Sequence, residues 1–168
     1  MPSIPPHQPR ILVVDDEPSL RDMLGILLRR EGFQVVAHPG YRLAVEAIRQ
    51  APTPFAVVLT DLVMPDGSGL DVLTAAKERA AATQVVVMTA HSTVEAAVDA
   101  MRRGAYDFIA KPFSNAEISA LVSKALEKRA IITENERLRA KVSHLEKREM
   151  FGSSPAAKII GDIVRKAA

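Results

Sequence analysis

Polar side chains that could take part in phosphoryl chemistry follow four short apolar runs of this sequence. These side chains are, in chain order, Asp15, Asp16, Asp61, Thr89 and Lys111. If the runs are parallel strands of one sheet, their carboxyl ends meet at one edge, where open α/β sheets bind ligands. Carboxylates suit Mg²⁺, and a hydroxyl and an ammonium can hold phosphoryl oxygens. The sequence therefore predicts a site for Mg²⁺ and a phosphoryl group at this edge.

The apolar runs have the composition of strands that are buried on both faces. Each is short and rich in Val, Ile or Phe, without the strict alternation of a half-exposed strand. We predict five such strands, at residues 10–14, 33–37, 55–60, 84–89 and 106–110.

Amphipathic helices are predicted between the strands. The first spans residues 18–31, with apolar side chains at helical spacing, and ends at Gly32. Serine and glutamate at the spacing of a capping box mark the starts of helices four and five. These pairs are Ser92 with Glu95, and Ser114 with Glu117. Gly104 fits the end of helix four, and the alternation as a whole predicts an α/β fold with a parallel sheet and helices on both faces.

The composition excludes several kinds of protein. There is no cysteine, which excludes disulfides and thiolate metal sites. No apolar stretch approaches the roughly 18 residues that a membrane span needs. The proline-rich start lacks the apolar core of a signal peptide. We therefore expect a cytoplasmic protein that makes no membrane contact, with a disordered arm over residues 1–8.

The net charge of +2 is unevenly distributed along the chain. Residues 1–128 carry a net charge of −2, and residues 129–168 carry +4. So modest an excess in a charged helix is typical of a solvated face. The basic end therefore does not by itself indicate nucleic-acid binding.

Four motifs, in this order, resemble the receiver domain of two-component response regulators. They are ILVVDDE, VVLTDLVMPDGSG, VVVMTA and DFIAKPF, and the resemblance covers residues 9–128. It implies a flavodoxin-like, doubly wound, five-stranded parallel sheet with strand order 2-1-3-4-5. In that order strands one and three are neighbours, so that Asp15, Asp16 and Asp61 would share one crevice.

The resemblance also assigns the metal site and the phosphoacceptor. Asp61 would accept the phosphoryl group. Asp16 and Asp61 would bind Mg²⁺ directly, Asp15 would contribute directly or through water, and the backbone carbonyl of Val63 would supply another oxygen. This set suits Mg²⁺, which keeps several waters and takes few protein ligands. The apolar Val63 side chain would not help to orient water. The chain would not be an enzyme beyond Mg²⁺-dependent self-phosphorylation from a phosphodonor and self-dephosphorylation.

Other roles implied by the resemblance concern the switch. Lys111 would pair with the phosphoryl oxygens, and the Thr89 hydroxyl would bond one of them once the group is attached. Phe108 would follow Thr89 inward, and the peptide bond between Lys111 and Pro112 would be cis. His91 lies where members of the family tune access of water, but an exposed polar loop residue is the simpler interpretation.

Each of these residues also has an interpretation without function. The acidic residues 15–17 could be a helix N-terminus that favours negative charge. Thr89 could be a strand-end hydroxyl, Lys111 could belong to a turn, and Phe108 could be a core residue. The combination of all four motifs favours the functional interpretation.

A long helix is predicted after residue 128, with a coiled-coil linker over residues 129–149. Its seam positions alternate in steps of four and three, and they are Ile131, Asn135, Leu138, Val142 and Leu145. An Asn at an a position costs stability but favours a parallel, in-register dimer. We therefore predict a homodimer. The alternative is a single helix that lies on the receiver.

Residues 150–168 are too few to form a domain. They resemble the opening of the AAA+ ATPase domain in the nitrogen-regulatory class of response regulators, which activate sigma-54 RNA polymerase. No glycine of the chain precedes a lysine, so the P-loop of such a domain is absent. We expect a truncated ATPase domain. A sensor histidine kinase would be the phosphodonor, and sigma-54 RNA polymerase and DNA would be partners only through domains missing from this chain.

Three functions are compatible with these features. The first is a phosphorylation switch that controls dimer geometry and thereby a sigma-54-dependent ATPase. The second is a receiver with a different output domain that binds DNA directly. The third is an aspartyl-phosphate phosphatase of the haloacid-dehalogenase kind, whose nucleophile lies in an Asp-x-Asp pattern. Here Leu62 and Val63 follow Asp61, which disfavours the third function.

Overall fold

The computed structural model describes residues 8–91, 93–152 and 163. The chain divides into two units, Met1–Arg129 and Ala130–Ala168. The arm predicted over residues 1–8 lies outside the described residues except for its last residue. The predicted start of an ATPase domain lies outside them beyond residue 152, apart from residue 163.

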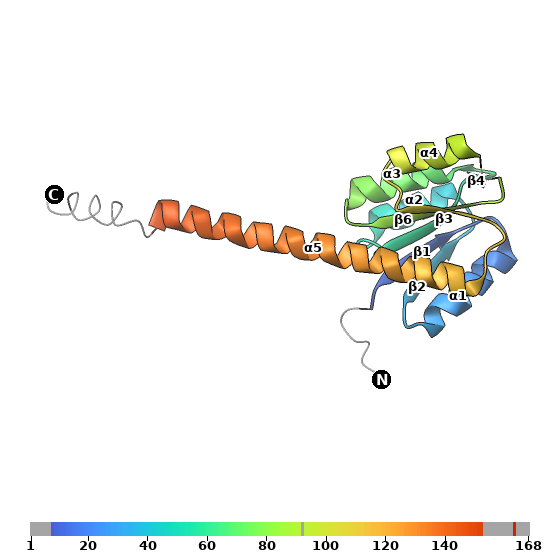
Figure 1. The fold of residues 1–168 in the computed structure, drawn as a ribbon, viewed down its shortest axis with the longest axis horizontal. Helices are drawn as coiled ribbons and strands as arrows, with labels where there is room; N and C mark the ends of the chain where they lie inside the picture. The colour runs from blue at the N-terminus through green and yellow to red at the C-terminus, as the bar shows by residue number, and fades with distance from the viewer. Residues whose placement is uncertain (1–7, 92, 153–162, 164–168) are drawn as a thin grey trace. The chain divides into compact units, whose positions relative to one another are not determined.

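Five parallel strands form the sheet of the first unit (Figure 1). They are β1 (Arg10–Val14), β2 (Gln34–His38), β3 (Val57–Asp61), β6 (Gln84–Thr89) and β7 (Asp107–Ala110). Their order is β2-β1-β3-β6-β7, with all neighbours parallel. This confirms the predicted flavodoxin-like order 2-1-3-4-5, and each predicted strand lies within two residues of an observed one.

The central strands are the most deeply buried part of the fold. Every residue of β3 and β6 is buried, whereas the edge strands β2 and β7 are partly exposed. Central strands of a parallel sheet are covered on both faces, which accounts for the continuous Val and Leu of their sequences.

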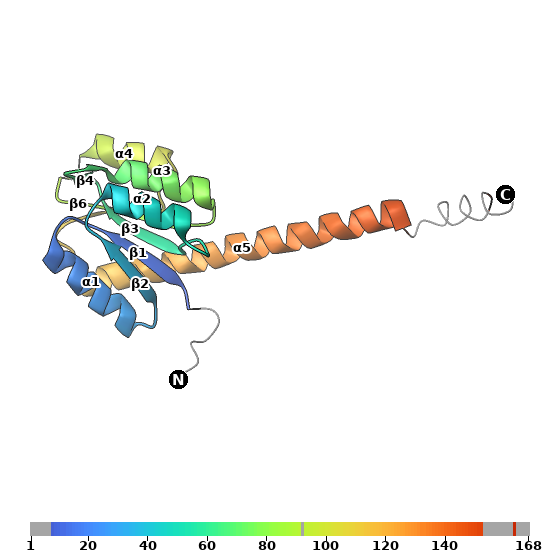
Figure 2. The same ribbon diagram turned by 180° about the vertical axis from the view of Figure 1, so that it is seen from behind.

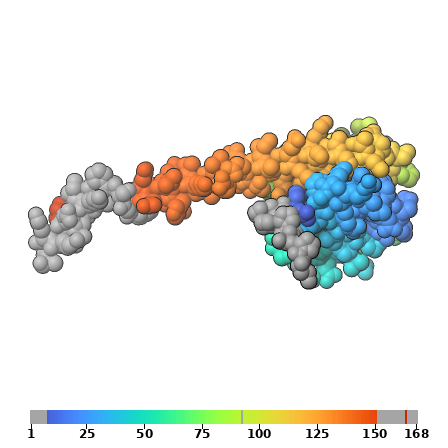
Figure 3. All heavy atoms as spheres, turned by 90° about the horizontal axis from the view of Figure 1, so that it is seen from below, coloured from blue at the N-terminus to red at the C-terminus, as the bar shows by residue number. Residues whose placement is uncertain are grey.

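Five helices cover the two faces of the sheet. They are α1 (Pro18–Arg30), α2 (Tyr41–Gln50), α3 (Gly69–Arg79), α4 (Val94–Arg102) and α5 (Asn115–Gly152). α2, α3 and α4 pack on one face, and α1 with the first part of α5 on the other (Figures 1 and 2). The face formed by α1 and the start of α5 is seen in Figure 3. Against the sheet, α5 buries Ile118, Val122 and Ala125, all 0% exposed, at the spacing of one helical face.

The predicted helix ends are confirmed except at the start of α4. Gly32 and Gly104 both have φ of +94°, the left-handed conformation that glycine adopts at helix ends. Ser114 and Glu117 form the predicted capping box before α5. The predicted N-cap of α4 was wrong, because the N-cap is Thr93, whose hydroxyl accepts from Ala96 N at 3.2 Å. The predicted cap, Ser92, lies outside the described residues.

A short antiparallel hairpin follows Asp61 and was not predicted. It pairs β4 (Val63–Met64) with β5 (Gly67–Ser68), directly before α3. Strands of two residues are too short for hydrophobic periodicity to reveal them. The hairpin connects the end of β3 to the start of α3, where the Ser68 hydroxyl caps the helix by accepting from Leu70 N.

In the second unit, α5 continues without a break to residue 152. The apolar residues of the predicted seam are exposed there: Ile131 by 70%, Leu138 by 50%, Val142 by 54% and Leu145 by 57%. Among the described residues, no helix combines the length and apolar character needed to cross a bilayer.

Candidate functional site

Three carboxylates gather where β1 and β3 end. Asp15 directly follows β1, Asp61 is the last residue of β3, and these strands are neighbours in the sheet. One carboxylate oxygen from each of Asp15, Asp16 and Asp61 lies within 4.8 Å of the others. We call these three residues the acid cluster. Asp15 and Asp61 are buried and Asp16 is exposed, so the cluster opens to solvent on one side.

Lys111 joins two members of the acid cluster. Its Nζ lies 2.7 Å from Asp15 Oδ2 and 3.0 Å from Asp61 Oδ2. The backbone N–H of Lys111 donates to the Thr89 carbonyl at 2.8 Å, which fixes the lysine at the end of β7. The peptide bond to Pro112 is cis, as predicted. Residues 96 positions apart in the chain therefore meet because parallel strands end at the same edge.

The charges of the site are unbalanced. Burial raises the pKa of Asp15, although the hydrogen bond from Lys111 opposes this rise. Burial alone would lower the pKa of Lys111, but its bonds to Asp15 and Asp61 outweigh burial and raise it. Lys111 is therefore a full positive charge at neutral pH. With all carboxylates ionised, the acid cluster and Lys111 together have a formal charge of −2, which a divalent cation with a preference for oxygen ligands would match.

Backbone N–H groups orient two of the carboxylates, and one arginine holds the backbone of Asp15. Glu17 N donates to Asp15 Oδ1 at 2.9 Å, and Val63 N approaches Asp61 Oδ1 at 3.3 Å. The Arg21 guanidinium donates to the Asp15 carbonyl at 2.6 Å. Arg21 was not among the site residues predicted from the sequence. The sequence pattern that could have revealed Arg21 is a basic residue in the first turns of a helix that directly follows an acidic strand end.

Thr89 and Phe108 lie on the neighbouring strands β6 and β7. Thr89 is the last residue of β6, and Phe108 pairs with Val87, two residues before that end. Thr89 is 1% exposed, and its hydroxyl accepts from His91 N at 3.0 Å and donates to the His91 carbonyl at 3.3 Å. Phe108 is partly buried and packs against the core on the α2, α3 and α4 side. Thr89 thus ends its strand at the edge that holds the acid cluster, whereas Phe108 lies two residues back from the end of β7. Among the contacts described in this structure, neither touches the acid cluster.

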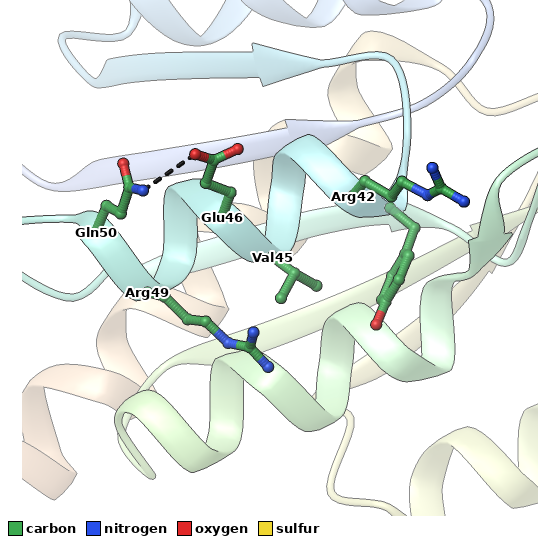
Figure 4. Close-up of a pocket in the computed structure, with 6 residues that line it drawn as sticks. Arg42, Val45, Glu46, Arg49 and Gln50 are labelled. Atoms are coloured by element: carbon green, nitrogen blue, oxygen red, sulfur yellow. Dashed lines mark hydrogen bonds between the residues drawn. The ribbon is translucent and has the colours of Figure 1, made fainter.

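Another hollow lies on the outer side of α2, away from these carboxylates. It encloses about 370 Å³, and Val45 and Arg49 point from α2 toward α3 along it (Figure 4). The Glu46 carboxylate is already engaged, since it accepts from Gln50 Nε2 at 3.0 Å. Side chains of opposite charge line this hollow, and they do not converge on a point. The hollow therefore lacks the converging carboxylates that make the acid cluster a candidate metal site.

Comparisons with known proteins agree with this geometry. The family described as "Response regulator receiver domain" matches residues 11–123. A putative response regulator, NtrX-like, of Rickettsia bellii is 32% identical over 144 residues, which cover 86% of this chain and 30% of that protein. The C4-dicarboxylate transport transcriptional regulatory protein DctD of Pseudomonas aeruginosa is 36% identical over 146 residues, again 86% of this chain and 30% of that protein. The chain thus spans about 30% of the length of these relatives.

Solved structures show the same architecture. The solution structure of the beryllofluoride-activated NtrC4 receiver domain dimer superposes with a TM-score of 0.66 at 36% identity, covering 71% of this chain and 98% of that one. Three findings indicate the same family: the strand order, the acid cluster with its lysine, and the family match over residues 11–123. This chain therefore belongs to the family of response regulator receiver domains, the phosphoacceptor regulatory domains of two-component systems.

Proposed function

We propose that this chain is a phosphorylation-dependent receiver in which Asp61 accepts the phosphoryl group. The observation that carries the proposal is the contact of the Lys111 ammonium with both Asp15 and Asp61. In the transfer, a carboxylate oxygen of Asp61 forms the new P–O bond. The bond between phosphorus and the donor breaks, and its electron pair leaves with the donor. A sensor histidine kinase would be the physiological donor.

The acid cluster, with the backbone carbonyl of Val63, would hold Mg²⁺. When bound, the ion neutralises charge on the carboxylates and on the incoming phosphoryl group. The donor set supports this proposal, because three converging carboxylates on one side of an open pocket leave room for the waters that Mg²⁺ retains. Asp15 and Asp61, the buried members, are oriented by backbone N–H groups before the ion arrives.

Lys111 and Thr89 would respond to the attached phosphoryl group. Lys111 can hold a phosphoryl oxygen as a point charge without moving far, since its Nζ already lies 3.0 Å from Asp61 Oδ2. The Thr89 hydroxyl would exchange its bonds with the His91 backbone for a bond to a phosphoryl oxygen. Such an exchange would move the loop after β6 and allow Phe108 to turn inward.

The output would be a change in the geometry of a homodimer joined through α5. The seam residues support this proposal, because Ile131, Leu138, Val142 and Leu145 are each at least half exposed in the single chain. Packing them against a second helix would bury this apolar surface. Asn135 would face Asn135 of the partner subunit and favour the parallel, in-register pairing.

Charges beside the seam also fit a second copy of this chain. In a parallel pair, Glu134 would face Arg139 of the partner subunit, and Lys141 would face Glu146 of the partner subunit. Both pairs have opposite charges. Within its own helix Glu134 already contacts Arg137 at 2.8 Å, so that Arg137 and the partner's Arg139 would share its carboxylate.

For the longer protein, we propose control of a sigma-54-dependent transcription-activating ATPase. Support comes from residues 150–168, which resemble the start of an AAA+ domain, and from DctD, whose name describes a transcriptional regulatory protein. A receiver that drives a domain binding DNA directly is the alternative, and the two differ only beyond residue 152. The phosphatase interpretation needs the pattern Asp-x-Asp, but Val63 stands at the position of the second aspartate after Asp61.

Phosphorylation with acetyl phosphate and Mg²⁺, followed by intact-mass spectrometry, tests the proposal. We expect one added phosphoryl group in the wild type and none in Asp61→Asn, while Asp71→Asn, on the exposed start of α3, labels normally. Chelation of Mg²⁺ should also prevent labelling, because the acid cluster repels a dianion. Undiminished labelling of Asp61→Asn would contradict the assignment.

A further inference from the structure

The first turn of α2 is capped by a residue from another part of the chain. Its N-cap residue is Gly40, which has no side chain to offer. Instead, the Asp66 carboxylate accepts from Tyr41 N at 2.9 Å through Oδ1 and from Arg42 N at 3.0 Å through Oδ2. The unpaired N–H groups at a helix start are satisfied in this way by a remote carboxylate, which also matches the helix dipole.

Asp66 lies in the turn of the hairpin that begins beside the phosphoacceptor. Val63 pairs with Ser68 and Met64 with Gly67, so residues 65 and 66 form the turn. At the other end of the hairpin, Val63 N approaches Asp61 Oδ1 at 3.3 Å. The short hairpin therefore has one end at the acid cluster and its turn bonded to α2.

Two glycines beside the contact lie where there is no room for a side chain. A Cβ on Gly40 would lie 2.5 Å from Asp66 Oδ1, and a Cβ on Gly67 would lie 2.7 Å from the Tyr41 ring. Gly40 has φ of −165°, an extended conformation that any residue adopts. Its backbone therefore does not require glycine, whereas the closeness of Asp66 does.

We propose that Asp66 is a positioning residue for the Mg²⁺ site. By holding the turn of the hairpin against α2, it fixes the strand whose Val63 carbonyl would bind the ion; the inference thus rests on the proposed function of the acid cluster. Asp66 is not itself a member of that cluster. Both of its carboxylate oxygens are engaged by α2, so its contribution passes through the backbone and not through direct ligation.

The pocket between these elements places the contact next to the cluster. It encloses about 240 Å³ and is lined by Asp16, Gly40 and Asp66 together with Pro39, Leu43 and Pro65. Asp16, the exposed member of the acid cluster, and Asp66 thus line the same pocket. Loosening the hairpin would alter the position of the Val63 carbonyl relative to Asp16 while leaving all three carboxylates in the chain.

Titration of the metal-free chain with Mg²⁺ tests this inference. Binding is followed by calorimetry and by the amide NMR signals of Asp16 and Val63. In Asp66→Ala we expect about tenfold weaker Mg²⁺ binding, the scale at which groups that orient metal ligands act. Asp66→Asn, which keeps one acceptor oxygen, should be intermediate. The control Asp71→Asn removes a nearby exposed charge and should bind Mg²⁺ like the wild type.

Gly40 supplies a second test that does not depend on removing a charge. Gly40→Ala should weaken Mg²⁺ binding when Asp66 is present, because the new Cβ displaces the carboxylate. In the Asp66→Ala background the same substitution should have no further effect. Amide hydrogen exchange at Tyr41 and Arg42 should be faster in each single variant, which shows that the cap has opened.

The outcomes separate this inference from the proposed function. If the wild type binds Mg²⁺ and accepts a phosphoryl group, while Asp66→Ala opens the cap yet binds Mg²⁺ with unchanged affinity, the inference is wrong and the proposed function stands. Additive effects of Gly40→Ala and Asp66→Ala on Mg²⁺ affinity would also overturn it. If the wild type does not bind Mg²⁺, the proposed function itself fails, and the inference fails with it.

Discussion

Replacing Lys111 by methionine removes the ammonium that contacts the acid cluster while it keeps most of the aliphatic stem. Both ion pairs are short and largely buried: the lysine side chain is 15% exposed, that of Asp15 is 0% exposed, and that of Asp61 is 12% exposed. The substitution therefore leaves carboxylates close together in a partly dry site. We expect the metal-free variant to be less stable than the wild type at neutral pH.

The size of the loss follows from the distances and the burial. At an effective dielectric constant of about 20, two unit charges about 4 Å apart interact by about 4 kcal/mol. Removal of one partner from a buried pair costs about 3–5 kcal/mol, because the remaining charge is uncompensated. The cluster is open to water at Asp16, which screens part of this interaction. The expected loss is therefore at the lower end, about 3 kcal/mol.

Urea unfolding followed by circular dichroism, with a chelator and then with Mg²⁺, measures this effect. At about a hundredfold excess over its dissociation constant, a ligand of the native state adds about 2.7 kcal/mol. Mg²⁺ should stabilise the Lys111→Met variant more than the wild type, because it replaces a missing positive charge. The deficit of the variant should therefore shrink when Mg²⁺ is present.

Lys77→Met is the matched control for this experiment. Its ammonium donates to the carbonyls of Thr83 at 2.6 Å and Ala81 at 3.2 Å and contacts no member of the acid cluster. Any loss in this variant should be the same with and without Mg²⁺. Unfolding of metal-free Lys111→Met within about 0.5 kcal/mol of the wild type, the range of an ordinary surface substitution, would refute a charge-compensating role for Lys111. A deficit that does not respond to Mg²⁺ would refute it equally.

Further predictions concern the switch, the dimer and the pH dependence of stability. Thr89→Ala should still accept a phosphoryl group, but hydrogen exchange over residues 89–110 should no longer change on phosphorylation as it does in the wild type. Leu138→Asp combined with Leu145→Asp should give monomers in sedimentation equilibrium. The control Ala140→Asp, which lies off the seam, should remain dimeric. A wild type that is monomeric at micromolar concentration would exclude the seam as the dimer interface. Burial lowers the pKa of His38 below its usual 6.5. As the pH falls, His38 is therefore protonated in the unfolded chain before it is protonated in the folded one. Stability should therefore fall as the pH drops below about 6.5, and His38→Gln should flatten this dependence in urea titrations.

The sheet and most of the site could be predicted because both follow from local composition and one rule of topology. Buried parallel strands must be apolar along their whole length, so β1, β3 and β6 are visible as runs of Val, Ile and Leu. The ends of such runs meet at one edge, which predicts that Asp15, Asp61 and Lys111 share that edge, and the strand order implied by the family resemblance makes Asp15 and Asp61 neighbours. Their contacts at 2.7 and 3.0 Å agree with that expectation.

The contacts that could not be predicted depend on short elements and on distances across the fold. The bonds from Tyr41 and Arg42 to Asp66 join residues 25 and 24 positions apart, and no periodicity connects them. The cap of α4 was misplaced by one residue because neighbouring hydroxyl residues are both good caps, and only the backbone conformation selects Thr93. The position of Arg21 beside the Asp15 carbonyl likewise depends on the path of the first helix.

The position of the predicted switch within the sheet has a physical reason. Thr89 is the last residue of β6, a strand whose residues are all buried and which lies between β3 and β7 in the sheet. Phe108 lies on β7, an edge strand that is only partly buried. Reorienting a side chain on an edge strand disturbs fewer packed neighbours than it would on β3 or β6, so its cost is lower. If the buried Thr89 hydroxyl binds the phosphoryl group as proposed, an aromatic ring on the neighbouring, partly exposed strand would allow this small local change to reach the surface of the domain.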